Sequence, residues 1–271
     1  MARQFEGRVA LVTGGGRGIG RILALGLADE GAAVAVVSRT RADLDRVVAE
    51  IEARGGRASA AVADVVDGAA VKAAVMESER VLGPVDILVS NAGVDAPFGP
   101  IGHVDPDDWW ATEAVHVKGA VNAMTAVLPG MRARGRGHIV CIASLAGTVV
   151  VPNMSAYAVA KATLIRLVEH VAAEQAGSGV AAFSMEPGTI HTSMMEHTIH
   201  SPEAQKWIPQ GLEFIQSITH EQSEASKRRV VEMVCQLASG AYDRLSGRYL
   251  DPGDDFDALL KAQGKDEAHV G

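Results

Sequence analysis

The chain has 271 residues, a net charge of −8 at pH 7, 48% apolar residues and 29 glycines, which suits a globular protein with a sizeable core and many tight turns. No basic tract accompanies the acidic balance, so no nucleic-acid partner is expected, and the apolar run near the N-terminus is too short for a signal peptide or a membrane span. The two cysteines, Cys141 and Cys235, lie in apolar stretches that favour buried thiols over a disulfide, and we therefore expect a cytoplasmic protein with no membrane association.

Short runs of β-type residues alternate with longer helical patterns along most of the chain. The strand-like runs cover residues 8–12, 33–37, 58–62, 85–90, 138–142, 180–185 and 248–250, and the helical patterns cover 18–30, 41–54, 67–82, 106–133, 155–176 and 222–239. This alternation predicts βαβ units with right-handed crossovers, and the nearly continuous apolar character of the strands indicates helices on both faces. The sequence therefore predicts an α/β fold, a single-domain doubly wound (Rossmann) mainly parallel seven-stranded sheet over residues 1–271.

A glycine-rich turn follows the first expected strand and precedes the first expected helix. Residues 13–20 read Thr-Gly-Gly-Gly-Arg-Gly-Ile-Gly. Glycines let the backbone turn tightly and approach a pyrophosphate, whose charge then lies against a helix N-terminus. Strand, glycine loop and helix in this order are the context that a dinucleotide-binding site needs. A flexible turn is the alternative, and the position between strand and helix disfavours it.

The end of the second expected strand bears on which dinucleotide would bind. An acidic residue about 20 residues past the glycine loop would bind a ribose 2′-hydroxyl and repel a 2′-phosphate. Here Ser38 and Arg39 follow the strand, and no carboxylate stands at its end. Arg39 could make a forked contact with a phosphate, with Arg17 of the glycine loop beside it. We therefore expect NADP(H) rather than NAD(H); two solvated surface arginines are the alternative.

A tyrosine and a lysine lie four residues apart in the helical pattern 155–176. At about 100° per residue, this step places Tyr157 and Lys161 on one helix face, one turn apart. Free tyrosine keeps its proton until about pH 10, and a cation within about 4–6 Å favours the phenolate. The spacing therefore indicates an acid–base pair, although Tyr-x-x-x-Lys also occurs on ordinary helices as a solvated pair.

Together these motifs resemble the short-chain dehydrogenase/reductase family. Thr-Gly-x-x-x-Gly-x-Gly is followed in order by Asp64, by Asn91-Ala92-Gly93, by a serine thirteen residues before the tyrosine, Ser144, and by Pro187-Gly188 with Thr192. The match spans residues 8 to about 192. It implies hydride transfer between a nicotinamide dinucleotide and a secondary alcohol or ketone.

The resemblance also implies roles for individual residues. Tyr157 would exchange a proton with the substrate oxygen, Lys161 would lower the tyrosine pKa and bind the nicotinamide ribose, and Ser144 would hydrogen-bond the same substrate oxygen. In similar proteins the helices corresponding to 106–133 and 155–176 form a dimer bundle, and a second contact makes homotetramers. The implied cofactor-binding residues are Gly14, Arg17, Gly18, Ile19, Gly20, Ser38, Arg39, Asp64, Val65, Asn91, Ala92, Gly93, Tyr157, Lys161, Pro187, Gly188, Ile190 and Thr192.

One position departs from the family pattern. The family usually has asparagine where this chain has His116, in the phrase His-Val-Lys-Gly. That asparagine helps to hold a water that supplies protons to the lysine. His116 could place the same water through its backbone carbonyl, its imidazole could join the proton relay and add a pH dependence, or the relay could be impaired. His116 is thus a candidate catalytic residue. The third possibility leaves open a dinucleotide-binding regulatory protein without turnover, which the intact Ser144, Tyr157 and Lys161 oppose.

Residues 190–223 are polar and rich in Met, His and Gln. They follow a strand end, where open α/β sheets bind ligands, and a long connection there is typical of a binding loop or a lid. We therefore expect 190–223 to be a substrate-binding loop or lid. Its apolar residues could line a pocket for a small alcohol or ketone, or form the packed side of a lid helix. The histidines of this segment and Cys235 lack metal-ligand spacing, so no metal site is expected.

Overall fold

The computed structural model describes residues 3–268, and its centre is one parallel sheet. The strand order is β3-β2-β1-β4-β5-β6-β7, and each neighbouring pair is parallel. The chain order reverses between β1 and β4, which is where doubly wound sheets open a crevice. The predicted doubly wound, seven-stranded sheet is therefore confirmed. The strands are β1 Val9–Thr13, β2 Ala33–Ser38, β3 Ala58–Val62, β4 Ile87–Ser90, β5 Gly137–Ile142, β6 Val180–Met185 and β7 Tyr249–Leu250.

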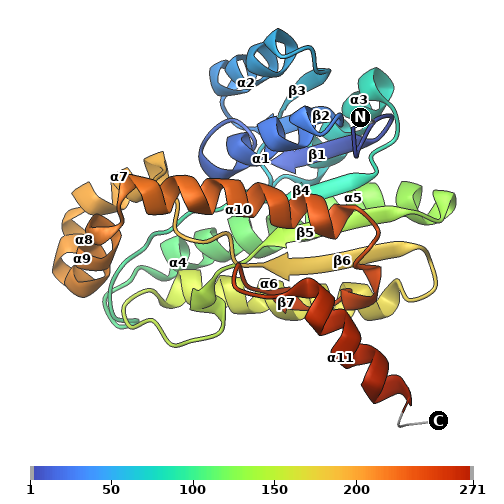
Figure 1. The fold of residues 1–271 in the computed structure, drawn as a ribbon. Helices are drawn as coiled ribbons and strands as arrows, with labels where there is room; N and C mark the ends of the chain where they lie inside the picture. Colours follow the sequence, from blue (N-terminus) through green and yellow to red (C-terminus); the bar gives the residue numbers. More distant parts are fainter. Residues whose placement is uncertain (1–2, 269–271) are drawn as a thin grey trace.

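Helices cover both faces of the sheet (Figure 1). Successive strand residues point to opposite faces, so Ala10 and Val12 join one core while Val9 and Leu11 join the other. Helices α1, α2 and α10 pack on the first core, and α3, α5 and α6 pack on the second. Their bounds are α1 Gly18–Asp29, α2 Arg41–Ala53, α3 Gly68–Leu82, α5 Gly119–Arg134, α6 Ser155–Glu174 and α10 His220–Ala238.

Three parts of the chain differ from the sequence expectation. The helix expected over 106–133 is divided into α4, Pro106–Glu113, a π-helical turn, Ala114–Lys118, and α5. Residues 193–217, part of the segment expected to be a substrate-binding loop or lid, form three short helices, and a further helix that the sequence did not predict extends away from the body near the C-terminus (Figure 1). These helices are α7 Ser193–His200, α8 Pro202–Trp207, α9 Pro209–Ser217 and α11 Phe256–Ala268.

Local signals explain the three short helices. Pro202 and Pro209 each stand at the start of a helix, where proline's fixed φ is favourable and its missing N–H costs nothing. The Thr192 side chain accepts from the backbone N–H of Met195 at 3.3 Å, which caps α7. The helices then pack on the segment after β4, because Ile208 and Leu212 form a small cluster with Phe98 that is separate from both main cores.

The turn after β5 packs directly on the backbone of α6. Residues Leu145–Gly147 form one 3₁₀ turn, and the Ser144 hydroxyl caps it by accepting from the N–H of Ala146 at 3.2 Å. A Cβ atom at Gly147 would lie 2.7 Å from the carbonyl carbon of Lys161. Because that atom belongs to the backbone of α6, only glycine allows this approach, which brings the Ser144 turn against the helix.

Gly147→Ala should therefore lower the free energy of unfolding by about 1–3 kcal/mol through overpacking. For a chain of this size the corresponding fall in Tm is about 2–10 °C. The measurement is thermal unfolding followed by circular dichroism. Gly102→Ala is the control, since a Cβ atom there meets nothing within 4 Å. Equal Tm values for the two variants would contradict the close packing.

Candidate active site

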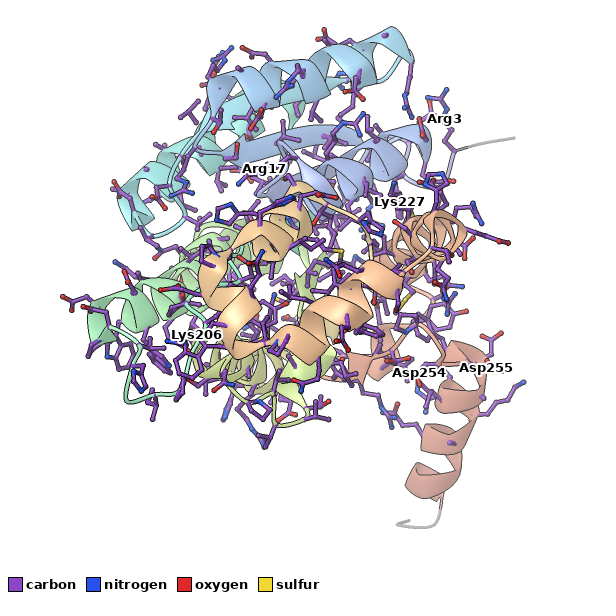
Figure 2. All side chains as sticks on the ribbon, turned by 90° about the vertical axis from the view of Figure 1, so that its left-hand side faces the viewer. Arg3, Arg17, Lys206, Lys227, Asp254 and Asp255 are labelled. Carbon is purple, nitrogen blue, oxygen red and sulfur yellow. The ribbon has the colours of Figure 1, made fainter. Side chains whose placement is uncertain are left out.

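A cavity opens at the carboxyl ends of the strands, between the glycine loop, the ends of β2 to β5, the π-helical turn, α6 and the start of α7. Figure 2 shows Arg17 at this side of the molecule, close to the short helices that follow β6. Every residue predicted to bind cofactor lines the cavity except Gly20, Gly188 and Ile190, and His116 lines it as well. The lining residues that the sequence did not single out are Gly16, Thr40, Asp43, Ala63, Val94, Val115, Ile142, Ala143, Ser193 and Met194.

The glycine loop is held against the end of β4 by close backbone contacts. Gly14 has φ +65°, and a Cβ atom there would lie 2.9 Å from the side-chain nitrogen of Asn91. That nitrogen donates to the Thr13 carbonyl at 3.0 Å, while the Thr13 hydroxyl accepts from the Asn91 N–H at 3.0 Å. A Cβ atom at Gly20 would lie 2.2 Å from the Gly14 carbonyl oxygen. Gly20 does not line the cavity; its lack of a side chain instead allows the close packing of the glycine loop on the start of α1.

The end of β2 contains both signs of charge. Arg17 and Arg39 line the cavity, and among the described residues neither side chain has a hydrogen bond or ion pair. Asp43 also lines the cavity, from the first turn of α2, and forms an ion pair with Arg46. No carboxylate follows β2 directly in the sequence, but the expectation that none lies near this strand end was wrong. The first turn of α2 places Asp43, five positions beyond Ser38, at the same part of the cavity. The Ser38 hydroxyl is buried and has no hydrogen-bond partner.

Tyr157 and Lys161 line the other end of the cavity, and Ser144, which does not line it, lies beside Tyr157. The Ser144 side chain hydrogen-bonds Tyr157. The Lys161 ammonium, on a side chain only 4% exposed, donates to the Ile142 carbonyl at 2.7 Å and lies 5.4 Å from the centre of the Tyr157 ring. Three segments that are distant in sequence thus bring together the three residues that the motifs singled out.

Burial sets the protonation of this pair. It raises the pKa of Tyr157 to about 12, the hydrogen bond from Ser144 lowers it, and the charges of Glu186 and Asp95 raise it further. Burial also lowers the pKa of Lys161 to about 8, against the nearby charge of Glu186. The net shift of Tyr157 is upward, opposite to the effect expected from Lys161 alone. At neutral pH the phenol is therefore protonated and can donate a proton.

His116 lies in the π-helical turn and is 2% exposed. Its Nε2 atom lies 2.7 Å from the Val94 carbonyl oxygen and 3.1 Å from the Val94 nitrogen, while Nδ1 has no partner among the described residues. The ring meets Tyr157 edge to face at 5.6 Å between centroids. Burial, with the charge of Lys161, lowers the pKa of His116 to about 3. The imidazole is thus neutral at physiological pH and offers hydrogen-bonding atoms without a change of charge.

Gly93 makes room for this imidazole. A Cβ atom at Gly93 would lie 2.5 Å from the Cε1 atom of His116. The sequence motifs included both Gly93 and His116 but did not indicate that the two are in contact. His116 is 22 residues from Val94, the neighbour of Gly93 to which its ring bonds, and contacts over such a separation have no sequence pattern.

The helices that follow β6 border the cavity through their first residues. Thr192, Ser193 and Met194 line it, whereas the more distant apolar residues of the segment pack on Phe98. The Thr198 hydroxyl, on α7, donates to the carboxylate of Asp95, which the sequence did not single out. An isolated carboxylate in a loop carries no pattern by which it could have been found.

In the described part of the chain, side chains that could ligate a metal ion do not cluster. Within residues 3–268, no three His, Cys, Asp or Glu side chains lie close enough together to hold a metal ion. Cys141 and Cys235 are buried free thiols. No helix in the same range is long and apolar enough to cross a membrane.

Comparison with known proteins adds to this geometry. Residues 8–203 match the family model described as short chain dehydrogenase. A short chain dehydrogenase of Pseudocercospora fijiensis is 32% identical over 269 residues, which cover 97% of this chain and 85% of that protein. A gluconate 5-dehydrogenase from Burkholderia cenocepacia, solved in complex with NADP and tartrate, is 32% identical with a TM-score of 0.78 and covers 92% of this chain and 95% of its own. An NAD⁺-bound xylitol dehydrogenase is 29% identical with a TM-score of 0.79, covering 91% and 98%.

The buried imidazole predicts how stability depends on pH. The pKa of His116 is about 3 in the folded chain and about 6.5 in an unfolded one, so below pH 6.5 only the unfolded state takes up a proton there. Stability is therefore retained above pH 6.5 and falls as the pH drops. Between pH 7.5 and 5.5 the wild type should lose about 1.4 kcal/mol relative to His116→Asn.

Urea unfolding at the two pH values measures this difference. His170→Asn, at an exposed position of α6, is the control for the loss of one histidine. The same pH dependence in the wild type and in His116→Asn would exclude a buried neutral imidazole.

Proposed function

Because the chain belongs to the short-chain dehydrogenase family, we propose that it is an oxidoreductase that transfers a hydride between NADP(H) and a secondary alcohol or ketone of a small molecule. The observation that carries this proposal is that Tyr157 and Lys161 line the cavity that continues to the glycine loop, with the Ser144 side chain bonded to Tyr157. The close approach of Gly14 and Gly20 fits the same ligand, since it leaves backbone N–H groups at the start of α1 free of side chains.

The nicotinamide, when bound, supplies or accepts the hydride. Tyr157 donates a proton to the substrate oxygen as the ketone is reduced, in keeping with its raised pKa. Ser144 hydrogen-bonds the same oxygen and fixes its distance from the phenol. Lys161, anchored on the Ile142 carbonyl, binds the ribose and keeps a positive charge beside the tyrosine. His116 holds the loop at Val94 and meets the Tyr157 ring in an edge-to-face contact, which orients the phenol.

NADP(H) is favoured by the unpaired arginines. Arg17 and Arg39 are both exposed at the cavity and have no partner in the described part of the chain, so they are available to a 2′-phosphate. The opposing carboxylate of Asp43 is already paired with Arg46. The unpartnered hydroxyl of Ser38 lies at the same end of the cavity and could donate to a phosphate oxygen.

Residues 190–223 would act as the lid over the substrate, because Thr192, Ser193 and Met194 line the same cavity as Tyr157. A homo-oligomer, in particular a homotetramer, is part of the same proposal. Its support is a set of exposed apolar side chains on three helices: Trp110 on α4 is 66% exposed, Val121 on α5 40%, and Val159 on α6 44%.

Tyr157→Phe should lower kcat for ketone reduction by about 10²–10⁴-fold, because it removes the proton donor. NADPH consumption with a panel of small ketones measures the rate, and fluorescence titration measures NADPH binding, which should persist. Tyr242→Phe is the matched control, since that hydroxyl bonds Asp257 far from the cavity. Full turnover by Tyr157→Phe would refute the assignment.

The cofactor assignment has its own test. The wild type should bind NADPH more tightly than NADH, and Arg39→Ala should weaken NADPH binding by about 10-fold or more, as expected for a charge-assisted bond, while leaving NADH binding unchanged. Arg41→Ala is the control, because Arg41 is ion-paired with Asp45 on the surface of α2. Tighter binding of NADH by the wild type would refute the preference for NADP(H).

A further inference from the structure

Glu186 is the first residue after β6, and its carboxylate bonds the turn after β5, the turn that follows Glu186 itself, and β7. It accepts from the backbone N–H of Leu145, from the N–H of Gly188 at 3.2 Å and from the Tyr249 hydroxyl at 3.5 Å. The backbone of Glu186 is itself held, because its N–H donates to the Leu250 carbonyl in β7 at 2.9 Å. No sequence motif singled out this residue.

The contacts of Glu186 bear directly on the proposed proton donor. Leu145 follows Ser144, so the bond to its N–H fixes the turn that presents the serine hydroxyl to Tyr157. Gly188 has φ +73°, and the bond to its N–H closes the turn at Pro187-Gly188, of which Pro187 lines the cavity. One carboxylate thus holds both the Ser144 turn and the Pro187-Gly188 turn.

The charge of Glu186 also reaches the acid–base pair. It raises the pKa of Tyr157 and that of Lys161. Burial raises the pKa of Glu186 itself, while the two backbone N–H donors and the charge of Lys161 lower it. The other ionisable groups that face Glu186 are Tyr249 and Asp251, from β7 and the residue after it. Asp95 is the other carboxylate whose charge acts on Tyr157.

We propose that Glu186 is a positioning residue of the reaction, which holds the Ser144 turn against Tyr157 and brings a carboxylate to the acid–base pair. This inference rests on the proposed function of Tyr157. It separates into two parts, because the hydrogen bonds depend on the length of the side chain and the electrostatic effect depends on its charge.

Glu186→Gln removes the charge and keeps the length. Loss of a negative charge favours the phenolate, so the pH above which ketone reduction declines should shift downward by about half a unit or more. Turnover should also fall, because the two backbone N–H groups bond different carboxylate oxygens and an amide has only one acceptor oxygen. Glu186→Asp keeps the charge but cannot reach both turns; it should lower kcat and leave the pH profile in place. A Glu186→Gln profile equal to that of the wild type would overturn the electrostatic part.

Tyr249→Phe is the matched control. It removes the weakest contact of Glu186 without changing its charge, so its pH profile should equal that of the wild type. If Glu186→Gln loses NADPH binding through misfolding, Glu186→Asp still decides the positioning part, and an unchanged kcat in that variant would overturn it.

A second measurement is independent of turnover. The chain has 3 tyrosines, so the tyrosinate absorbance of Tyr157 can be isolated by subtracting the titration of Tyr157→Phe. Tyr157 should ionise at lower pH in the Glu186→Gln background than in the wild type, even if no ketone in the panel is reduced. Failure of the proposed function would abolish turnover but leave this shift; failure of the inference would leave turnover and abolish the shift.

Discussion

The Lys161 ammonium is a charge enclosed by protein, and a buried charge is costly unless it is hydrogen-bonded and opposed by an opposite charge. Its hydrogen bond to the Ile142 carbonyl joins the first turns of α6 to the end of β5. The negative charge of Glu186 also stabilises the charged form of Lys161. Because α6 is fixed in this way, Tyr157 is fixed too, and the Ser144 turn can pack on the backbone of the helix. The reacting end therefore depends on satisfying one ammonium group inside the fold.

Much of this architecture could be predicted from the sequence because its signals are local. Parallel strands covered on both faces are short apolar runs, and the predicted strand 180–185 matches β6, which is buried throughout, at both ends. The glycine loop was found because its glycines stand between a strand and a helix. Ser144, Tyr157 and Lys161 were found because family motifs fix their spacing, and the structure then brings them together.

The features that were missed depend on contacts between distant segments. The helices α7–α9 gain their apolar partner from Phe98, about a hundred residues earlier, so the sequence of 190–223 indicated a loop or lid but not the bounds of its helices. Asp43 and Glu186 are single carboxylates without a pattern, and only the folded chain shows which cavity or turn they touch. The direction of the Tyr157 pKa shift was also missed, because the spacing of Tyr and Lys says nothing about burial.

The small cluster of Phe98, Ala204, Ile208 and Leu212 is separate from the two cores that flank the sheet. Elements with their own apolar contacts can open as a local cooperative unit, at a lower free energy than global unfolding. Residues 193–217 can therefore accept substitutions without disturbing the packing of the sheet. Under the proposed lid role of this segment, substrate choice and fold stability would draw on different sets of residues, so a lineage could change one while the other is preserved.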